Sequence, residues 1–401
     1  MRVAVTGASG QVGSWVVELL NAGFQPAEVV AVCRNAFNAG LIGHARCKLR
    51  VGSILDPASA RQTLSGCEAV AHCARAGGLP RESLRQNLAM IRAIAAVPEV
   101  RRFIYLSSVA AYGDCIDRRA DRFDDPRPGK FYGREKLLCE REVARAFAGH
   151  GRQWFVLRLG HVYGPGQWLS KSVALWALSD EFRLPFAGAN LSNAIRVDRV
   201  ADAVAALLES RVPPGVYNLA DDPHLSWRQL FDWHAQVLGL PEVRSLEPEE
   251  SARLRAAALS GKRSMLRRAL RESTGWLRRL PAGYLSACPS LQELTYNLLA
   301  KLPAAWGERA RNAKWRALAA ASRPEGGHVN AAALPSYLFS DPMPGPYLKL
   351  LGSEREETMR RLLLNWYLAW SRPDGAWLAA PADPTAGTPP AQVADSRPAG
   401  P

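Results

Sequence analysis

The sequence lacks the features of exported, membrane-spanning and disulfide-stabilised proteins. No stretch reaches the roughly 18 consecutive apolar residues that a spanning helix requires, and the N-terminal MRVAVTGASG has no apolar run ahead of a cleavage site. The seven cysteines are scattered and form no C-x-x-C pair, which argues against a disulfide framework or a zinc site. With 48% hydrophobic and 22% charged residues, the chain also differs from disordered and collagen-like proteins. We expect a folded, cytoplasmic protein of two or three domains without a bound metal.

Acidic residues are nearly missing from residues 251–323. This segment holds 15 lysines and arginines but only 3 acids, so +12 of the net charge of +14 lies there. Three interpretations stay open: a solvated helical cap beside the substrate site, steering of an anionic substrate, or peripheral contact with a membrane surface. Nucleic-acid binding is not expected, because no recognised reading motif accompanies the charge.

Short β-branched and apolar runs alternate with helical patterns through the first 160 residues. Such alternation favours right-handed βαβ crossovers and a parallel sheet covered by helices on both faces. The sequence therefore predicts an α/β fold with a Rossmann-type, doubly wound parallel sheet, a smaller C-terminal substrate-binding part and an accessory basic helical segment. The expected strands are 2–6, 28–33, 48–51, 68–72, 102–106 and 154–159.

The alternation of strand and helix patterns loosens after Pro165, and we divide the whole chain into five expected parts. A helix at 199–208, a strand at 215–220 and a helix at 226–238 succeed one another, the last with a capping box of Ser226 and Gln229. The expected parts are a Rossmann domain at 1–165, with elements continuing to about 240, a substrate-binding part at 166–250, a basic helical insertion or cap at 251–335, a C-terminal helical part at 336–372 and a disordered tail rich in Pro, Ala and Gly at 373–401.

A glycine-rich turn joins the first expected strand to the first helix. There, backbone N–H groups and the helix N-terminus can meet a pyrophosphate. The same spacing suits a tight turn without a ligand, but its place at the start of a βαβ unit favours a nucleotide. The residues expected to contact that nucleotide are Thr6, Gly7, Ser9, Gly10, Gln11, Val12 and Gly13.

Tyr132 and Lys136 form a Y-x-x-x-K pair some twenty residues after the fifth expected strand, which ends near Ser108. Residues at positions i and i+4 share one helix face, so the ammonium can favour proton loss from the phenol and make it a usable acid or base. Ser108 can hydrogen-bond a substrate oxygen. Alone, such a pair is more often an ordinary surface feature; together with the glycine turn it indicates a catalytic site.

These motifs resemble the extended short-chain dehydrogenase/reductase family, which includes nucleotide-sugar epimerases, 3β-hydroxysteroid dehydrogenases and dihydroflavonol-type ketone reductases. The resemblance runs from Met1 to about Leu238. It rests on T-G-x-x-G-x-x-G at 6–13, S-S-x-x-x-Y-G at 107–113, Y-x-x-x-K at 132–136 and R-x-x-x-V-Y-G-P-G at 158–166.

The resemblance implies a domain that binds NAD or NADP. Tyr132 would be the general acid/base, Lys136 would hold the nicotinamide ribose, and Ser108 would orient the substrate oxygen. Further cofactor-binding positions implied by the family are Ser53, Ile54, His72, Cys73, Ala74, Asn87, His161 and Val162, besides Tyr132 and Lys136 themselves.

Three departures from the family pattern narrow the expectation. Ser53 stands where many members bind adenine with an Asp, which leaves Asp56 as a weaker substitute, and His161 stands where nucleotide-sugar members often have Asn. Val109 and Ala110 follow Ser108 where sugar 4,6-dehydratases carry an Asp-Glu pair. We therefore do not expect a dehydratase.

Arg34 ends the second expected strand. NAD-preferring relatives present an acidic residue there to the ribose hydroxyls, whereas a basic group suits the 2′-phosphate of NADP. The alternative is an ordinary exposed arginine. We favour NADP over NAD.

The expected function is an NAD(P)-dependent oxidoreductase that moves hydride between nicotinamide and a carbinol or ketone carbon. A nucleotide-sugar epimerase or reductase is favoured. The alternatives are a ketone reductase or 3β-hydroxysteroid-dehydrogenase-like enzyme on an apolar substrate and a non-catalytic NAD(P)-sensing protein, against which the intact Ser108, Tyr132 and Lys136 argue. The expected partner is a small molecule that can be anionic, and a homodimer is allowed for.

Membrane contact through residues 251–323 can be tested with liposomes. Each Lys or Arg near an anionic surface contributes about 1 kcal/mol, within a Debye length of about 8 Å at physiological salt. The protein should then sediment with anionic but not neutral liposomes, and less so at high salt. If it stays in the supernatant throughout, the segment is a cap or a steering surface.

Overall fold

The computed structural model describes the parts of the chain that build the sheet, its flanking helices and the C-terminal helical part. These are residues 1–23, 28–35, 38–39, 42, 47–77, 80–113, 126, 128, 131–149, 151–179, 182–209, 212–259, 336–350 and 355–371. Most of the basic segment at 251–335 and the tail at 373–401 therefore lie outside the described residues.

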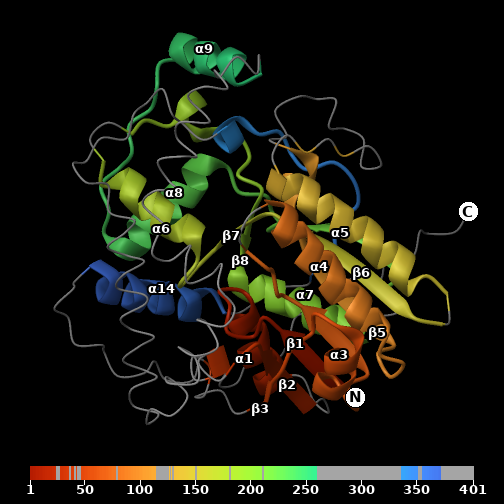
Figure 1. Ribbon diagram of the computed structural model, residues 1–401. Coiled ribbons are helices and arrows are strands. Elements are labelled where there is room, and N and C mark those ends of the chain that lie inside the picture. Colours follow the sequence, from red (N-terminus) through yellow and green to blue (C-terminus); the bar gives the residue numbers. More distant parts are fainter. Residues whose placement is uncertain are drawn as a thin grey trace, which may run out of the picture.

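Seven strands form one parallel sheet within the described residues (Figure 1), in the order β3-β2-β1-β4-β5-β6-β9. The predicted fold class is confirmed. The sheet extends past residue 165, because its last strand, at residues 215–219, lies beyond that point in the chain. The strands are β1 Arg2–Thr6, β2 Glu28–Cys33, β3 Lys48–Val51, β4 Ala69–His72, β5 Arg102–Ser108, β6 Gln153–Leu159 and β9 Gly215–Leu219.

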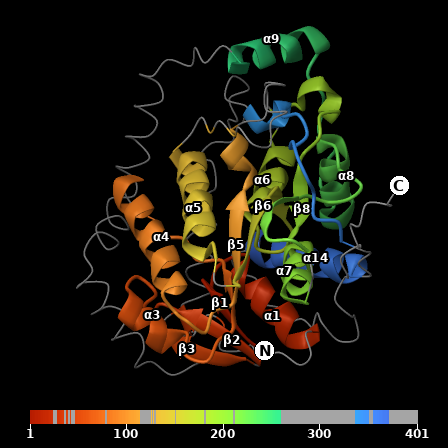
Figure 2. The same cartoon turned by 90° about the vertical axis from the view of Figure 1, so that its right-hand side faces the viewer.

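Two apolar layers cover the sheet because its central strands are buried on both faces. One core contains Val3, Val5 and Ile104 with residues of α1 (Gly13–Gly23) and α7 (Val197–Glu209). The other contains Ala4, Val70 and Phe103 with residues of α3 (Pro57–Thr63), α4 (Pro80–Ala95) and α5 (Phe131–Phe147). Figure 2 shows α3, α4 and α5 on one side of the strands and α1 and α7 on the other.

The chain changes direction across the sheet between β1 and β4. From β1 it builds outward through β2 and β3, and it then returns to the other side of β1. In open parallel sheets, ligands bind outside the carboxyl ends of the strands at such a switch point. A ligand site is therefore expected at the turns after β1 and β4.

A second, smaller unit packs beside the sheet. It has its own core of aromatic and aliphatic side chains, including Phe182, Trp227 and Phe231. Its helix α8 (Trp227–Leu238) begins with the predicted capping box, since Ser226 and Gln229 bond each other's backbone N–H groups. Its other elements are β7 His161–Tyr163, α6 Trp168–Ala177, η3 Pro185–Gly188, β8 Ala194–Arg196, α9 Pro248–Leu259 and η5 Ser336–Phe339.

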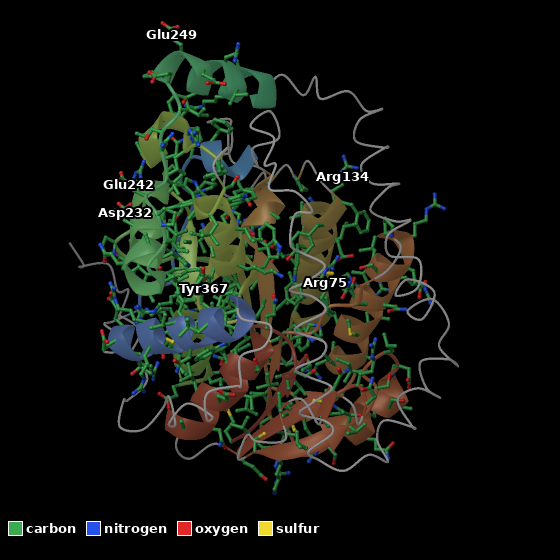
Figure 3. All side chains as sticks on the ribbon, turned by 90° about the vertical axis from the view of Figure 1, so that its left-hand side faces the viewer. Arg75, Arg134, Asp232, Glu242, Glu249 and Tyr367 are labelled. Atoms are coloured by element: carbon green, nitrogen blue, oxygen red, sulfur yellow. The ribbon has the colours of Figure 1, made fainter. Side chains whose placement is uncertain are left out.

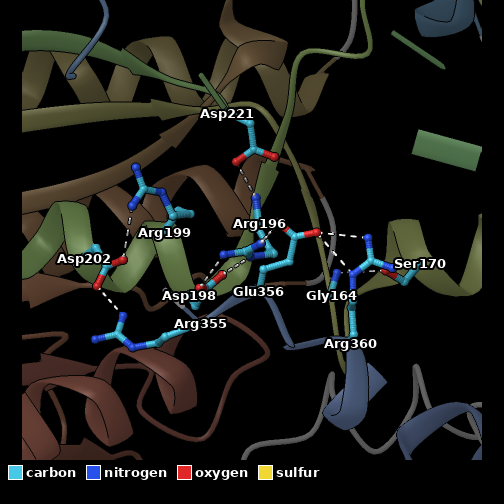
Figure 4. Close-up of polar contacts among 10 residues, drawn as sticks. All are labelled: Gly164, Ser170, Arg196, Asp198, Arg199, Asp202, Asp221, Arg355, Glu356 and Arg360. Carbon is cyan, nitrogen blue, oxygen red and sulfur yellow. Dashed lines mark hydrogen bonds and ion pairs between the residues drawn. The ribbon is translucent and has the colours of Figure 1, made fainter. Parts of the chain in front are cut away.

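The C-terminal helix α14 (Glu356–Ser371) is tied to the sheet domain by buried charges (Figure 4). Arg355, directly before it, donates to Asp202 of α7 at 2.6 Å, and both side chains are buried. Met359 of α14 packs against Val197 and Trp15. Separating a buried ion pair leaves an uncompensated charge in the interior, which is strongly destabilising. The contact between Arg355 and Asp202 therefore fixes the register of α14 on α7. No helix among the described residues is long and apolar enough to cross a bilayer.

His234 of α8 lies at the centre of a buried hydrogen-bond chain. Its Nδ1 is 2.8 Å from the Leu230 carbonyl and must donate, so Nε2 accepts from Ser170 Oγ, also at 2.8 Å. Ser170 Oγ in turn accepts from the Gly164 N–H. Burial lowers the pKa of His234 to about 4, and the ring is neutral in the folded protein.

This buried ring should make stability depend on pH. An unfolded imidazole takes up a proton near pH 6.5, well above the folded value, so the unfolded state binds more protons as pH falls and stability decreases. For this one group the loss between pH 7.5 and pH 5 is about 2 kcal/mol. Urea unfolding of the wild type and of His234→Gln should show a smaller loss over this interval in the variant; equal losses would contradict the neutral assignment.

Candidate active site

The glycine turn after β1 packs directly on the end of β4. Gly7 has φ +66°, and a Cβ there would lie 2.6 Å from the Ala74 Cα and N. A Cβ on Gly13 would lie 2.2 Å from the Gly7 carbonyl oxygen, and the Gly10 N–H donates to that same oxygen. Only glycine fits these positions.

The same turn delivers the N-terminus of α1 to the carboxyl edge of the sheet. The first turn of α1 contains no acidic residue. A helix N-terminus attracts anions through its N–H groups and its dipole. The turn is therefore suited to the pyrophosphate of a dinucleotide, which would meet Ser9, Gln11 and Val12 there.

Thr6 and His72 fasten β1 to β4 beneath the turn. Thr6 Oγ1 and His72 Nδ1 are hydrogen-bonded at 2.7 Å, and both side chains are buried. Burial and the nearby Lys136 ammonium lower the pKa of His72 to about 3, so its ring is neutral. Burial raises the pKa of Cys73 to about 12. These residues support the turn from below.

Lys136 anchors the predicted catalytic pair. It is 7% exposed, and its Nζ donates to the Leu106 carbonyl of β5 at 2.7 Å. Its Nζ also lies 4.8 Å from the centre of the Tyr105 ring and 5.9 Å from that of Tyr132. Tyr132 itself is 39% exposed. The structure thus holds a buried ammonium under an accessible phenol.

Gly133 lets α5 approach the end of β5. A Cβ on Gly133 would lie 2.0 Å from the Ala110 carbonyl oxygen in η1 (Val109–Tyr112). Ser108 precedes this turn as its N-cap, and its Oγ accepts from the Ala110 N–H at 3.2 Å. Within the described residues the Ser108 hydroxyl proton has no acceptor, so it can be donated to a ligand. Sequence reasoning missed Gly133, although a glycine directly after the tyrosine in a helix was a signal of close packing.

A buried ion pair supports β5 and β6 below this edge. Arg158 donates to Glu140 of α5 at 2.7 Å, and both are buried. Ser107 also donates to Glu140, and the Arg158 guanidinium lies 4.6 Å from the centre of the Tyr112 ring. The ends of β5 and β6 are thereby joined to α5.

Several residues of the adenine and cofactor predictions make structural contacts in the fold. Asn87 accepts from the Ala76 N–H and donates to the Ser83 carbonyl. Ile54 lies in a hydrophobic core. Asp56, the weaker substitute for an adenine-binding Asp, caps α3 by accepting from the Ser59 N–H.

Ser53 and Arg34 lie on the β2-β3 side of the switch point. Ser53 accepts from the Leu55 N–H through its hydroxyl and from Thr63 through its carbonyl. Arg34 directly follows β2 and is exposed. A ligand that extends from the glycine turn toward β2 would therefore meet the Arg34 charge.

His161 and Val162 lie in β7 of the smaller unit. The His161 ring is 4.8 Å from that of Tyr337, between ring centres. Val162 packs with Trp15 at the core around α14. Within the described residues, no group of three or more His, Cys, Asp and Glu side chains could hold a metal ion.

Arg75 lies beside Tyr132, a position that sequence reasoning missed. It follows β4 by three residues, and its guanidinium carbon lies 4.9 Å from the centre of the Tyr132 ring. Its Nε donates to Glu135 of α5 at 2.7 Å. An arginine directly after the H-x-A stretch and a glutamate inside Y-x-x-x-K were the available signals, but nothing in the sequence showed that they meet.

Comparisons with known proteins point to one family. Residues 3–220 match the model of the NAD dependent epimerase/dehydratase family. The 2′-dehydrokanamycin reductase of Streptomyces kanamyceticus is 29% identical over 250 residues, which cover 60% of this chain and 68% of that protein. The dTDP-6-deoxy-L-talose 4-dehydrogenase (NAD(P)(+)) of Kitasatospora kifunensis is 30% identical over 162 residues, 38% of this chain and about half (51%) of that protein.

A solved structure shares the fold. The UDP-glucuronic acid 4-epimerase from Bacillus cereus, in complex with NAD, aligns with a TM-score of 0.51 at 20% identity, over 62% of this chain and 88% of that one. The family match covers more than half of the chain and contains the glycine turn, Tyr132 and Lys136. The chain belongs to the NAD dependent epimerase/dehydratase family and is an enzyme of the extended short-chain dehydrogenase/reductase type.

Proposed function

We propose that this enzyme transfers hydride between a nicotinamide cofactor and a carbinol or ketone carbon of a sugar, with a nucleotide-sugar epimerase or reductase favoured. The observation that carries the proposal is the placement of Tyr132 above the buried Lys136 at the same sheet edge as the glycine turn. A dinucleotide on that turn can bring its far end to the tyrosine.

The chain's own residues supply the proton chemistry. The Tyr132 hydroxyl exchanges a proton with the substrate oxygen, and the Ser108 hydroxyl donates to that oxygen. The Lys136 ammonium has three N–H donors, of which one binds the Leu106 carbonyl. The other two can donate to ligand hydroxyls. When bound, the nicotinamide supplies or accepts the hydride at its C4 atom.

The names of the relatives support a carbohydrate substrate. One is a reductase of a dehydrokanamycin, and the other is a dehydrogenase of a dTDP-linked deoxyhexose. Neither name supports the alternative of an apolar ketone or a sterol-like alcohol. The retention of Ser108, Tyr132 and Lys136 around one edge argues against a non-catalytic sensor.

Replacing Tyr132 by Phe should lower turnover by about 10² or more and leave cofactor binding nearly unchanged, because only the proton donor is removed. Initial rates of cofactor oxidation with keto sugars, beside fluorescence titration of the cofactor, measure both quantities. Tyr217→Phe is a matched control, since its hydroxyl donates to the Pro213 carbonyl, outside the site. Unchanged rates in Tyr132→Phe would end the catalytic assignment.

Arg34 supports a preference for NADP, because its charge lies directly after β2 without burial. NADPH should bind more tightly than NADH, by roughly ten- to hundredfold for one charged hydrogen bond. Arg34→Asp should reverse the order by repelling the 2′-phosphate. Arg101→Asp, an exposed residue directly before β5 and so at the opposite end of the strands, controls for net charge. Equal dissociation constants for the two cofactors in the wild type would refute this role.

A further inference from the structure

Arg75 is held rigidly beside the proposed catalytic tyrosine. The close contact between Gly7 and Ala74 fixes the backbone one residue before Arg75, and this sets where Arg75 lies in space. Its Nε is bound by Glu135, and its guanidinium lies against the Tyr132 ring. Figure 3 shows Arg75 close to the ribbons of α4 and α5. An arginine restrained at Nε and over one face is pre-organised for a further ligand.

The anchor of Arg75 is itself built into the fold. Glu135 is 1% exposed, and its second carboxylate oxygen lies 2.5 Å from Ser83 Oγ. Ser83 also accepts from Asn87, which holds the loop after β4 to α4. A buried carboxylate is costly unless it is paired and hydrogen-bonded, so Glu135 and Arg75 constrain each other.

Among the described residues, the two terminal amino groups of Arg75 make no hydrogen bond or ion pair within the protein. The side chain is 39% exposed, and among the described residues its only ion pair is the one through Nε with Glu135. The two terminal amino groups form a planar donor pair, which matches both oxygens of a carboxylate. This fork lies next to the phenol that would exchange the proton of the reaction.

We propose that Arg75 is a specificity-determining residue that binds a carboxylate on the substrate, close to the reacting carbon. The inference rests on the proposed function and narrows its substrate class to sugar acids, such as a hexuronate whose carboxylate is attached to the ring carbon next to the one that is oxidised or reduced. Lys136 is buried and bound to the Leu106 carbonyl, whereas Arg75 presents an accessible fork. The two cations therefore have separate tasks, one toward the cofactor and one toward the substrate.

The test compares two ligands that differ only at this group. UDP-glucuronate and UDP-glucose differ by a carboxylate against a hydroxymethyl, and their affinities for the full-length protein with NADP present can be measured by calorimetry. We expect the wild type to bind the uronate about 10- to 100-fold more tightly, the range of a charged hydrogen-bond pair. Arg75→Met should abolish this preference, and Arg75→Lys should keep part of it because the charge remains without the fork.

Arg134→Met is the matched control. Arg134 lies on α5, is exposed, and projects outward in Figure 3, so its removal changes the net charge equally but should keep the preference. Because Arg75→Met leaves Glu135 buried without its cation, the double variant Arg75→Met with Glu135→Gln serves if the single variant fails to fold.

The possible outcomes separate this inference from the proposed function. Equal affinities in the wild type, no binding of either ligand, or a uronate preference that persists in the Arg75 variants would overturn the carboxylate assignment. None of these results depends on turnover, so hydride transfer to a neutral sugar could still be observed. Loss of hydride transfer with an intact uronate preference would instead refute the proposed reaction and leave Arg75 as a binding residue.

Discussion

The close backbone contact between the β1 turn and the β4 end is the constraint on which the site depends. No side chain fits between Gly7 and Ala74, so the two strand ends meet at atomic contact. This brings the N-terminus of α1 to the sheet edge and starts the loop that carries Arg75 toward α5. A second close approach, of Gly133 to Ala110, places Tyr132 near Ser108. The absence of a Cβ atom at Gly7 and at Gly133 thus determines where the proposed cofactor-binding and proton-transfer groups lie.

Much of the sheet domain could be predicted because its signals are local. Hydrophobic periodicity, β-branched runs and the Ser226 capping box depend only on residues close together in the sequence. The strands and the capped helix that they predicted are present in the structure. The roles of Asn87 and Arg75 could not be predicted, because each depends on a partner from another element. The Asn87 side-chain amide hydrogen-bonds the Ala76 backbone. The match of Asn87 to a position in the family pattern does not reveal this contact.

The C-terminal part shows the same limit. The helical pattern of α14 was visible in the sequence, but its attachment to α7 through Arg355 and Asp202 joins residues 153 positions apart. Such pairs follow from tertiary packing. Through Met359, which packs with Trp15 in the first turn of α1, this attachment reaches the helix that would face the cofactor. The C-terminal helix therefore belongs to the support of the candidate site.

Deuterium transfer tests the central claim, that this sheet edge carries out hydride transfer, most directly. The protein, in excess over NADP or NAD, is mixed with UDP-glucuronate or UDP-glucose that carries deuterium at C4 of the sugar. The reaction is quenched, and the cofactor is analysed by mass spectrometry. The account predicts deuterium in the reduced cofactor with the wild type and none with Lys136→Met. A cofactor that binds but stays unlabelled, or equal labelling in both proteins, would contradict it.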